Sequence, residues 1–181
     1  MVRKILVIAA LSTLVVGCGG SKTTKGANDA GLPDWVMNPV KEAGYLFGAG
    51  IAEQSSPQLA IETADLRAKK EIAKALSQRV ATLMKDFMSQ ASIGEEAERT
   101  EFVQSISKSI TDVELNGCTI EKRENKDGKY YSLAKYPLDI GMRSMVQGLI
   151  RNSLSSNEAL RAAFEAKQGF DELDKELQNL R

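Results

Sequence analysis

The sequence predicts a small α+β domain, in which an antiparallel sheet of about three strands packs against a long helix. Residues 45–52 form an uninterrupted aromatic and apolar run that is typical of a strand. Apolar residues recur at helical spacing between Ile61 and Phe87, and Asp127-Gly128 stands between two further strand-like segments. We expect this domain to cover residues 33–150 and a C-terminal helix to cover residues 151–181.

The N-terminal segment is typical of an export signal. Arg3 and Lys4 precede an apolar run at 5–16, which is shorter than the roughly 20 residues needed to span a bilayer. The stretch 14–18 (Leu-Val-Val-Gly-Cys) resembles a bacterial lipobox. This resemblance implies a signal peptide at 1–17, cleavage between Gly17 and Cys18, and covalent diacylglycerol and palmitate on Cys18. An uncleaved helix or a signal without lipid is the alternative.

Residues 18–32 have the composition of a linker, being small and polar from Gly19 onward. In sorted lipoproteins an aspartate after the lipidated cysteine retains the protein at the inner membrane, and this chain has Gly19 there. We therefore expect a lipid anchor in the outer membrane, on its periplasmic or its surface face. The membrane is then the first partner of the chain.

Composition excludes several classes of function. The 181 residues include no histidine, which removes the commonest general base and metal ligand. Without residues 1–17 the chain has 22 basic and 24 acidic residues, so nothing favours nucleic acid as a partner. If Cys18 carries lipid, Cys118 is a lone thiol, which we expect to be buried and inert rather than reactive. We expect no metal, no other cofactor and no enzymatic activity.

Two features near the start of the domain have competing interpretations. Trp35, the only tryptophan, is expected to anchor its segment to the domain rather than to bind a ligand. The small residues at 48–50 indicate that another element packs closely against the first strand. They also resemble part of a dinucleotide fingerprint, but Glu53 occupies the position of the third glycine and disfavours that reading.

The long helix is expected to begin at Ser55-Ser56-Pro57 and to end near 92–94. Its early alanines, such as Ala64 and Ala68, allow close packing on a sheet. Met84 and Met88 are interpreted as packing residues, not as ligands for a soft metal. A second helix follows from the acidic residues at 95–98.

Residues 113–136 are expected to form a hairpin, with a bulge near Asn116-Gly117. Tyr130 and Tyr131 on its return arm are either half-buried strand residues or a surface for stacking against a ligand.

The remaining sequence is helical to Arg181, with a weak point at 153–157. Beyond it, heptad-like spacing joins Ala159, Ala163, Ala166, Phe170, Leu173, Leu177 and Leu180. This seam either packs back on the domain or pairs with a partner helix. Phe170, Leu173 and Leu177 are therefore candidate interaction residues, and a homo-oligomer is one expectation.

The chain resembles the twenty-kilodalton outer-membrane lipoprotein family (the Lpp-twenty type), to which flagellar outer-membrane lipoprotein P is related. The resemblance rests on 33–36 (Pro-Asp-Trp-Val), on 45–50, and on the Ala60/Ala64/Ala68 helix with Arg67 and 71–73 (Glu-Ile-Ala). It covers about 33–140 and the lipobox.

The resemblance implies a non-enzymatic structural or interaction module of the cell envelope, whose partners are other envelope proteins. Some members are associated with flagella, so a flagellar association is one expectation, and none of the family's residues is catalytic. The alternative function is an envelope module that binds peptidoglycan or lipid through Tyr130 and Tyr131. An enzyme would need a cleft with two carboxylates of perturbed ionisation.

Overall fold

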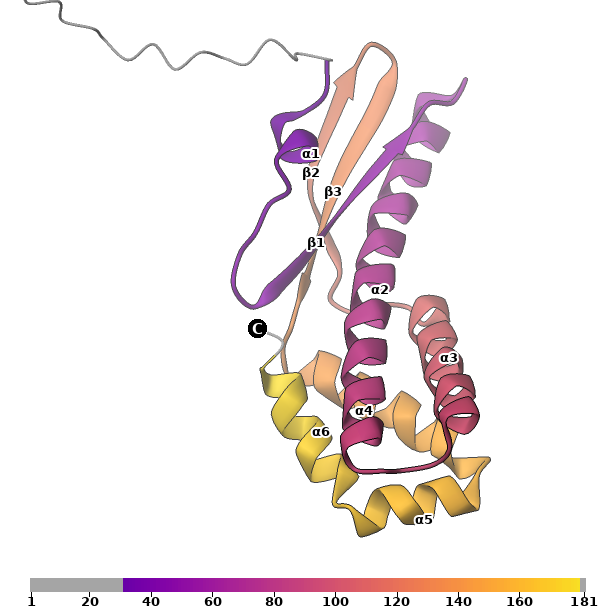
Figure 1. Ribbon diagram of the computed structural model, residues 1–181. Helices are drawn as coiled ribbons and strands as arrows, with labels where there is room; N and C mark the ends of the chain where they lie inside the picture. The colour runs from indigo at the N-terminus through magenta and orange to yellow at the C-terminus, as the bar shows by residue number, and fades with distance from the viewer. Residues whose placement is uncertain (1–30, 180–181) are drawn as a thin grey trace, which may run out of the picture. The chain divides into compact units, whose positions relative to one another are not determined.

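The computed structural model describes residues 31–179, which belong to one compact unit. The described helices and strands are α1 (Asp34–Met37), β1 (Tyr45–Ala52), α2 (Pro57–Gln90), α3 (Glu96–Asp112), β2 (Thr119–Lys126), β3 (Lys129–Pro137), α4 (Ile140–Ser155), α5 (Glu158–Ala166) and α6 (Gly169–Gln178). The strands form one antiparallel sheet in the order β1-β3-β2 (Figure 1). The predicted α+β fold is confirmed.

The β2–β3 hairpin closes on the two-residue turn that the sequence predicts. Asp127 and Gly128 both have positive φ angles, 52° and 79°, as a type I′ turn requires. Lys126 pairs with Lys129 directly across this turn. The hairpin is therefore set by local turn chemistry.

The start of the hairpin differs from the expectation. Residues 113–118 form a loop rather than the beginning of a strand, and Gly117 within it has a φ of +87°. The irregular pairing lies between Ile120 and Lys122, so the bulge predicted at Asn116-Gly117 is wrong. The shift of apolar positions along this stretch reflects a loop that reorients the chain before β2 begins.

Helix α2 packs its first half closely on one face of the sheet. It begins at Pro57, as predicted, and turns Ala64 and Ala68 toward β1. A Cβ atom at Gly48 would overlap the backbone of Ala68, and one at Gly50 would overlap the backbone of Ala64. The glycines and alanines therefore allow the helix and the strand to approach more closely than larger side chains would permit.

The opposite face of the sheet is covered by the segment that carries α1. Trp35 is 7% exposed and packs with Tyr131 and Leu133 of β3. Its indole Nε1 donates a hydrogen bond of 2.7 Å to Glu124 Oε1 on β2. The prediction that Trp35 anchors its segment is confirmed, and its one polar atom is satisfied within the domain.

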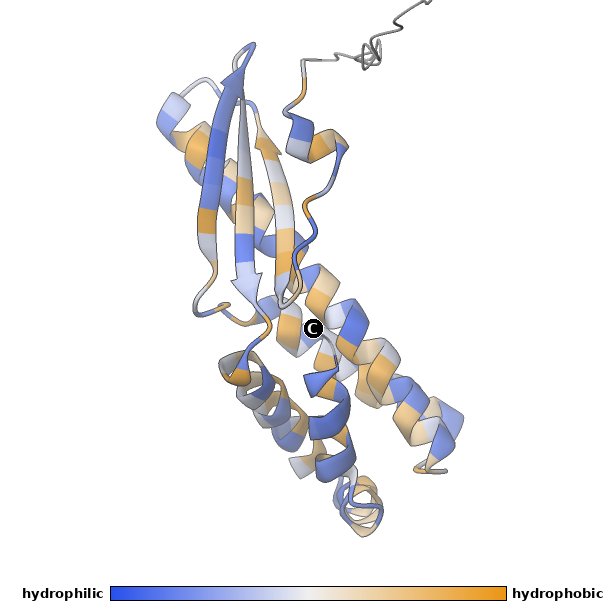
Figure 2. Ribbon diagram, turned by 90° about the vertical axis from the view of Figure 1, so that its left-hand side faces the viewer, coloured by the Kyte–Doolittle hydropathy of each residue, from blue (hydrophilic) through white to orange (hydrophobic). Residues whose placement is uncertain are grey.

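The second half of α2 extends beyond the sheet into a helical core shared with α3 to α6 (Figure 1). Figure 2 shows that these helices present hydrophobic residues on one side and hydrophilic residues on the other. Fully buried residues of this core include Met84, Met88, Ile106, Val146, Leu154 and Phe164. The interpretation of both methionines as packing residues is confirmed.

The C-terminal segment is not the single helix expected over 151–181. It contains the end of α4 and then two short helices, α5 and α6. The Asn157 side chain caps α5 by accepting a hydrogen bond of 3.0 Å from the amide of Leu160. Gln168 then adopts a φ of +53° before α6. These two local breaks fold the chain back on itself.

The predicted seam is therefore only partly realised. Leu173 and Leu177 are each 1% exposed and lie in the helical core, whereas Ala159 and Ala166 are exposed. Of the two expectations for this segment, packing back on the domain is what the structure shows. A continuous heptad face does not form because the helix ends between the two halves of the seam.

Candidate interaction groove

The residues with the most specific predicted chemistry lie outside the described part of the chain. Gly17 and Cys18, the predicted cleavage and lipidation positions, fall within residues 1–30, together with the predicted signal peptide. Most of the predicted linker at 18–32 falls there as well. The structure describes candidate sites only within residues 31–179.

The two tyrosines of the hairpin do not form one surface. Successive residues of a strand point to opposite faces. Tyr131 is 2% exposed and packs under Trp35, whereas Tyr130 lies on the face that carries α2. A stacking platform made from both rings is therefore not present in this arrangement.

The three predicted interaction residues of the C-terminal segment differ in exposure. Leu173 and Leu177 belong to the core and are not available to a partner. The Phe170 ring is partly buried, packs edge to face on Phe164, and lies 3.8 Å from the guanidinium carbon of Arg151. Phe170 therefore lies at the rim of the core, covered by a cation rather than open to solvent.

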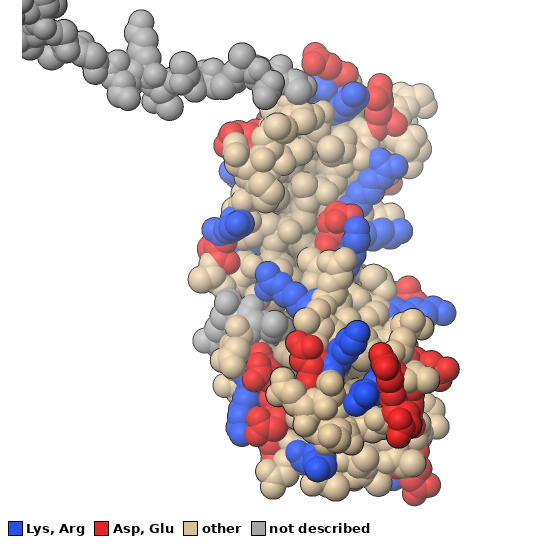
Figure 3. Space-filling model, in the orientation of Figure 1, with Lys and Arg blue, Asp and Glu red and all other residues tan. Residues whose placement is uncertain are grey.

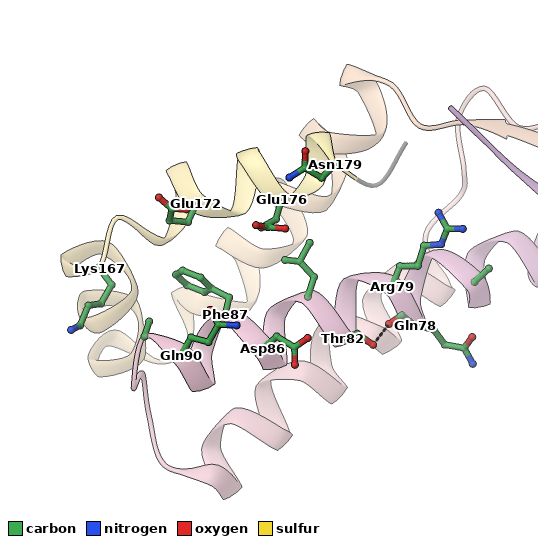
Figure 4. Close-up of a pocket in the computed structure, with 13 residues that line it drawn as sticks. Gln78, Arg79, Thr82, Asp86, Phe87, Gln90, Lys167, Glu172, Glu176 and Asn179 are labelled. Atoms are coloured by element: carbon green, nitrogen blue, oxygen red, sulfur yellow. Dashed lines mark hydrogen bonds between the residues drawn. The ribbon is translucent and has the colours of Figure 1, made fainter. Parts of the chain in front are cut away.

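A groove of about 940 Å³ lies between the outward side of α2 and helix α6. Its lining comes from two segments far apart in the sequence, which Figure 4 shows facing each other. The lining residues are Ala75, Gln78, Arg79, Thr82, Leu83, Asp86, Phe87, Gln90 and Ala91 on one side, and Lys167, Glu172, Glu176 and Asn179 on the other.

The floor of this groove is held by the core beneath it. Leu83 and Phe87 are partly buried and pack against the helical core. The Phe87 ring meets that of Phe164 edge to face, with the centroids 5.3 Å apart. Ala75 and Thr82 are small, so the middle of α2 remains accessible. The groove is thus a preformed apolar floor with polar walls, a combination that suits an amphipathic helix.

The walls of the groove carry more negative than positive charge. Asp86 on α2 and Glu172 and Glu176 on α6 contribute three carboxylates, against the two cations Arg79 and Lys167. Figure 3 shows charges of both signs gathered over the helical end of the molecule. Glu172 is paired with Lys175 of α6 at 2.7 Å, so Asp86 and Glu176 are the carboxylates that favour a ligand with positive charge over an anionic one.

One signal in the sequence could have indicated this groove. Two columns of large apolar residues run side by side on α2, one with Leu83 and Phe87 and the other with Met84 and Met88. A helix with one neighbour needs only one such stripe. The structure buries the methionines completely and leaves the other column partly exposed, where α6 covers it incompletely.

A second polar cluster connects α2 to the sheet. Asp65 Oδ2 accepts a hydrogen bond of 2.6 Å from Arg123 Nη2, and Asp65 Oδ1 accepts bonds of 3.0 Å from Arg123 Nε and 2.6 Å from Ser132 Oγ. Arg123 and Ser132 are register partners on β2 and β3. Sequence patterns did not single out this cluster, because its members are 58 and 67 residues apart.

The electrostatics of this cluster favour a structural role. Burial acts to raise the pKa of Asp65, but the hydrogen bonds from Arg123 and Ser132, and the charges of Arg123 and Lys69, outweigh it and hold that pKa below 3.8. Both carboxylate oxygens are occupied by donors from the sheet. Asp65 is therefore a fixed anion that clamps α2 onto β2 and β3, and is not poised as a general base.

Cys118 is partly buried beside the core, in the loop that precedes β2. Burial raises the pKa of its thiol, and the charge of Lys69 offsets this only in part. Less of the reactive thiolate is therefore present than in a free cysteine at neutral pH.

Within residues 31–179, no group of three or more cysteine, aspartate or glutamate side chains is placed to hold a metal ion. No helix in this part of the chain is long and apolar enough to cross a membrane.

No protein-family model matches the chain, and no curated protein or solved structure matches it. What the groove binds is therefore inferred from its own geometry and charge.

Proposed function

We propose that the chain is an outer-membrane lipoprotein, anchored through lipid on Cys18, whose domain is a non-enzymatic interaction module of the cell envelope. The observation that carries this proposal is the basic, apolar and lipobox-like sequence that ends at Gly17-Cys18. The compact domain that begins at Gly31 supports it, because that domain follows the cysteine after twelve residues.

The length of this connection limits where the domain acts. A fully extended chain from Cys18 to Gly31 spans at most about 45 Å. The start of the domain at Gly31 therefore lies within this distance of the membrane surface. Several acyl chains hold such a protein firmly, whereas a single chain does not.

The groove between α2 and α6 is the proposed binding site of this module. Its occupant is an amphipathic helix of another envelope protein, with apolar residues toward Leu83 and Phe87 and basic residues toward Asp86 and Glu176. The apolar floor and the excess of carboxylates support this assignment.

The anchor is tested by growing cells with radiolabelled palmitate. The wild-type chain and the Cys118→Ser variant are expected to incorporate label, and the Cys18→Ser variant is expected to incorporate none. Cys118→Ser is the matched control, because it removes the only other cysteine. Equal labelling of Cys18→Ser and wild type would refute the anchor.

The groove is tested by placing a photo-crosslinking residue at Thr82 in intact cells. We expect an adduct with a second protein whose linked peptide is a basic amphipathic helix. The double variant Glu172→Lys, Glu176→Lys is expected to abolish this adduct by reversing the charge of one wall. The same crosslinker at Ser105, an exposed residue of α3, is the control site. An adduct that survives the charge reversal would contradict the proposed occupant.

A further inference from the structure

The first half of α2 leaves an apolar side uncovered. Leu59 and Leu66 are 49% and 54% exposed, and they are the only exposed leucines among residues 31–179. They are seven residues apart and so lie on one line along the helix. Ala64 and Ala68 face β1, and Leu66 lies two residues from each of them. Two residues correspond to a rotation of about 200° around the helix axis, so Leu66 points away from the sheet.

The same line is covered further along the helix. Ala73, the next residue in the series, is only 5% exposed. One turn later, Ser77 Oγ donates a hydrogen bond of 3.1 Å to the carbonyl oxygen of Ser107 on α3. Figure 1 shows α3 lying against the second half of α2 and ending before the first half. The exposed leucines thus continue a helix-packing face that has no second helix within the described chain.

The charges beside Leu66 are arranged symmetrically. Glu62 lies four residues before Leu66 and Lys70 lies four residues after it, and both are exposed. Glu62 has one described contact, a hydrogen bond of 2.7 Å from Gln58 on the same helix. In two antiparallel helices related by a two-fold axis at Leu66, a residue four positions before the axis faces the residue four positions after it in the other helix.

We propose that this face of α2 binds the same face of a second copy of the chain, in an antiparallel helix pair centred on Leu66. Leu66 then meets its counterpart on the axis. Glu62 faces Lys70 of the second copy, and Lys70 faces Glu62, so both charge pairs are attractive. A parallel pair would place like charges opposite each other at both positions, which disfavours that alternative.

The expected association is weak in solution and favoured at a membrane. The uncovered part of this face ends before Ala73, so the two copies bury less area than a standard stable interface. Anchoring confines the copies to one surface and raises their effective concentration. This last point rests on the proposed lipid anchor, whereas the helix pair itself does not.

Exchanging the charges of Glu62 and Lys70 gives the decisive test. The quantity measured is the self-association constant of the purified full chain, obtained by sedimentation. Glu62→Lys and Lys70→Glu each place two like charges across the axis and are expected to weaken association roughly tenfold. The double variant Glu62→Lys, Lys70→Glu restores both pairs and is expected to return association to the wild-type value. A double variant no stronger than the single variants would overturn the proposal.

Cysteine crosslinking tests the geometry in cells. In a Cys118→Ser background, Leu66→Cys is expected to give a disulfide-linked dimer, whereas Lys122→Cys, on the exposed edge strand β2, is expected to remain monomeric. An adduct of another mass at Leu66, or equal dimer at Lys122, would overturn the proposal. Sedimentation of the Cys18→Ser chain separates the helix-pair hypothesis from the lipid-anchor hypothesis. Loss of the anchor leaves the α2 face intact, so this chain should still self-associate in solution.

Discussion

At the scale of single residues, the contact between Asp65 and Arg123 shows how one carboxylate links three elements. Asp65 lies on α2, and its donors lie on β2 and β3. The Asp65 side chain is 19% exposed and that of Arg123 is 52% exposed. Half-exposed ion pairs contribute little by charge alone, so the hydrogen bonds account for most of the stabilisation.

Asp65→Asn is expected to lower the free energy of unfolding at pH 7 by about 1 to 2 kcal/mol, because it removes the charge from these hydrogen bonds. The pKa of Asp65 is lower in the folded chain than in the unfolded chain. Its contribution is therefore present above pH 3.8 and is lost as the pH falls through the folded-state pKa. Urea unfolding between pH 7 and pH 3 measures both effects.

The difference between wild type and Asp65→Asn should therefore shrink as the pH is lowered. Asp86→Asn is the matched control, since Asp86 is an exposed aspartate of the same helix, and it should change stability by less than about 0.5 kcal/mol. A difference between wild type and Asp65→Asn that stays constant down to pH 3 would show that the charge of Asp65 is not the stabilising feature.

At the scale of elements, the contact between α2 and β1 depends on the absence of side chains. Gly48 and Gly50 turn toward α2, and the helix backbone occupies the space that a Cβ atom would need. Because this contact involves backbone on both sides, rotamer changes cannot relieve an added methyl group. The helix would have to move away from the strand along its first half.

Gly50→Ala is expected to lower the free energy of unfolding by about 3 kcal/mol through this overlap. Gly148→Ala in α4 is the control, because nothing lies within 4 Å of the added Cβ atom. It should stabilise the protein by about 0.5 to 1 kcal/mol through helix propensity. Denaturant unfolding measures both changes, and two variants of equal stability would contradict the close approach of α2 to β1.

The C-terminal segment shows where periodicity is an incomplete guide to an element. The break at Asn157 falls in the weak point expected at 153–157, but the seam that begins at Ala159 has the right spacing for one helix and is nevertheless interrupted at Gln168. After the break at Gln168 the chain passes so close to the Phe164 ring that a Cβ atom at residue 169 would lie 2.6 Å from it, which requires the glycine found there. Heptad spacing in the sequence does not predict this contact between residue 169 and the Phe164 ring.

At the scale of the whole molecule, α2 runs through one continuous core, which extends from the sheet into the helical end of the chain, while a smaller cluster around Trp35 lies on the other face of the sheet. Its first half packs on the sheet, whose other face buries Trp35, and its second half enters the helical core around Phe164. A helix of 34 residues cannot lose one half of its contacts without weakening the other. We therefore expect residues 31–179 to unfold in one cooperative transition.

Phe164→Ala is expected to lower stability by about 4 kcal/mol, because a fully buried ring is replaced by a cavity. Trp35 is the only tryptophan, and it reports from the sheet rather than from the helical core. Its fluorescence and the far-ultraviolet circular dichroism should show the same lowered midpoint. A tryptophan transition that keeps the wild-type midpoint would show that the two regions unfold independently.

The sequence by itself determined the features that depend on neighbouring residues. The start of α2 at Pro57, the turn at Asp127-Gly128 and the strand at 45–52 follow from the placement of proline, turn chemistry and side-chain pattern, which act over a few residues. The lipobox-like stretch at Gly17-Cys18 is also local, and it remains a prediction outside the described residues.

Only the tertiary structure decided which surfaces remain open. Leu83, Leu177 and Leu66 all belong to apolar patterns of helical spacing, yet Leu83 lines a groove, Leu177 lies in the core and Leu66 faces solvent. The packing of α3 and α6 decides which of these leucines is buried. Asp65 and Arg123 are joined across 58 residues that no local pattern connects. Burial is a property of what the rest of the chain covers, and that depends on long-range contacts rather than on local spacing.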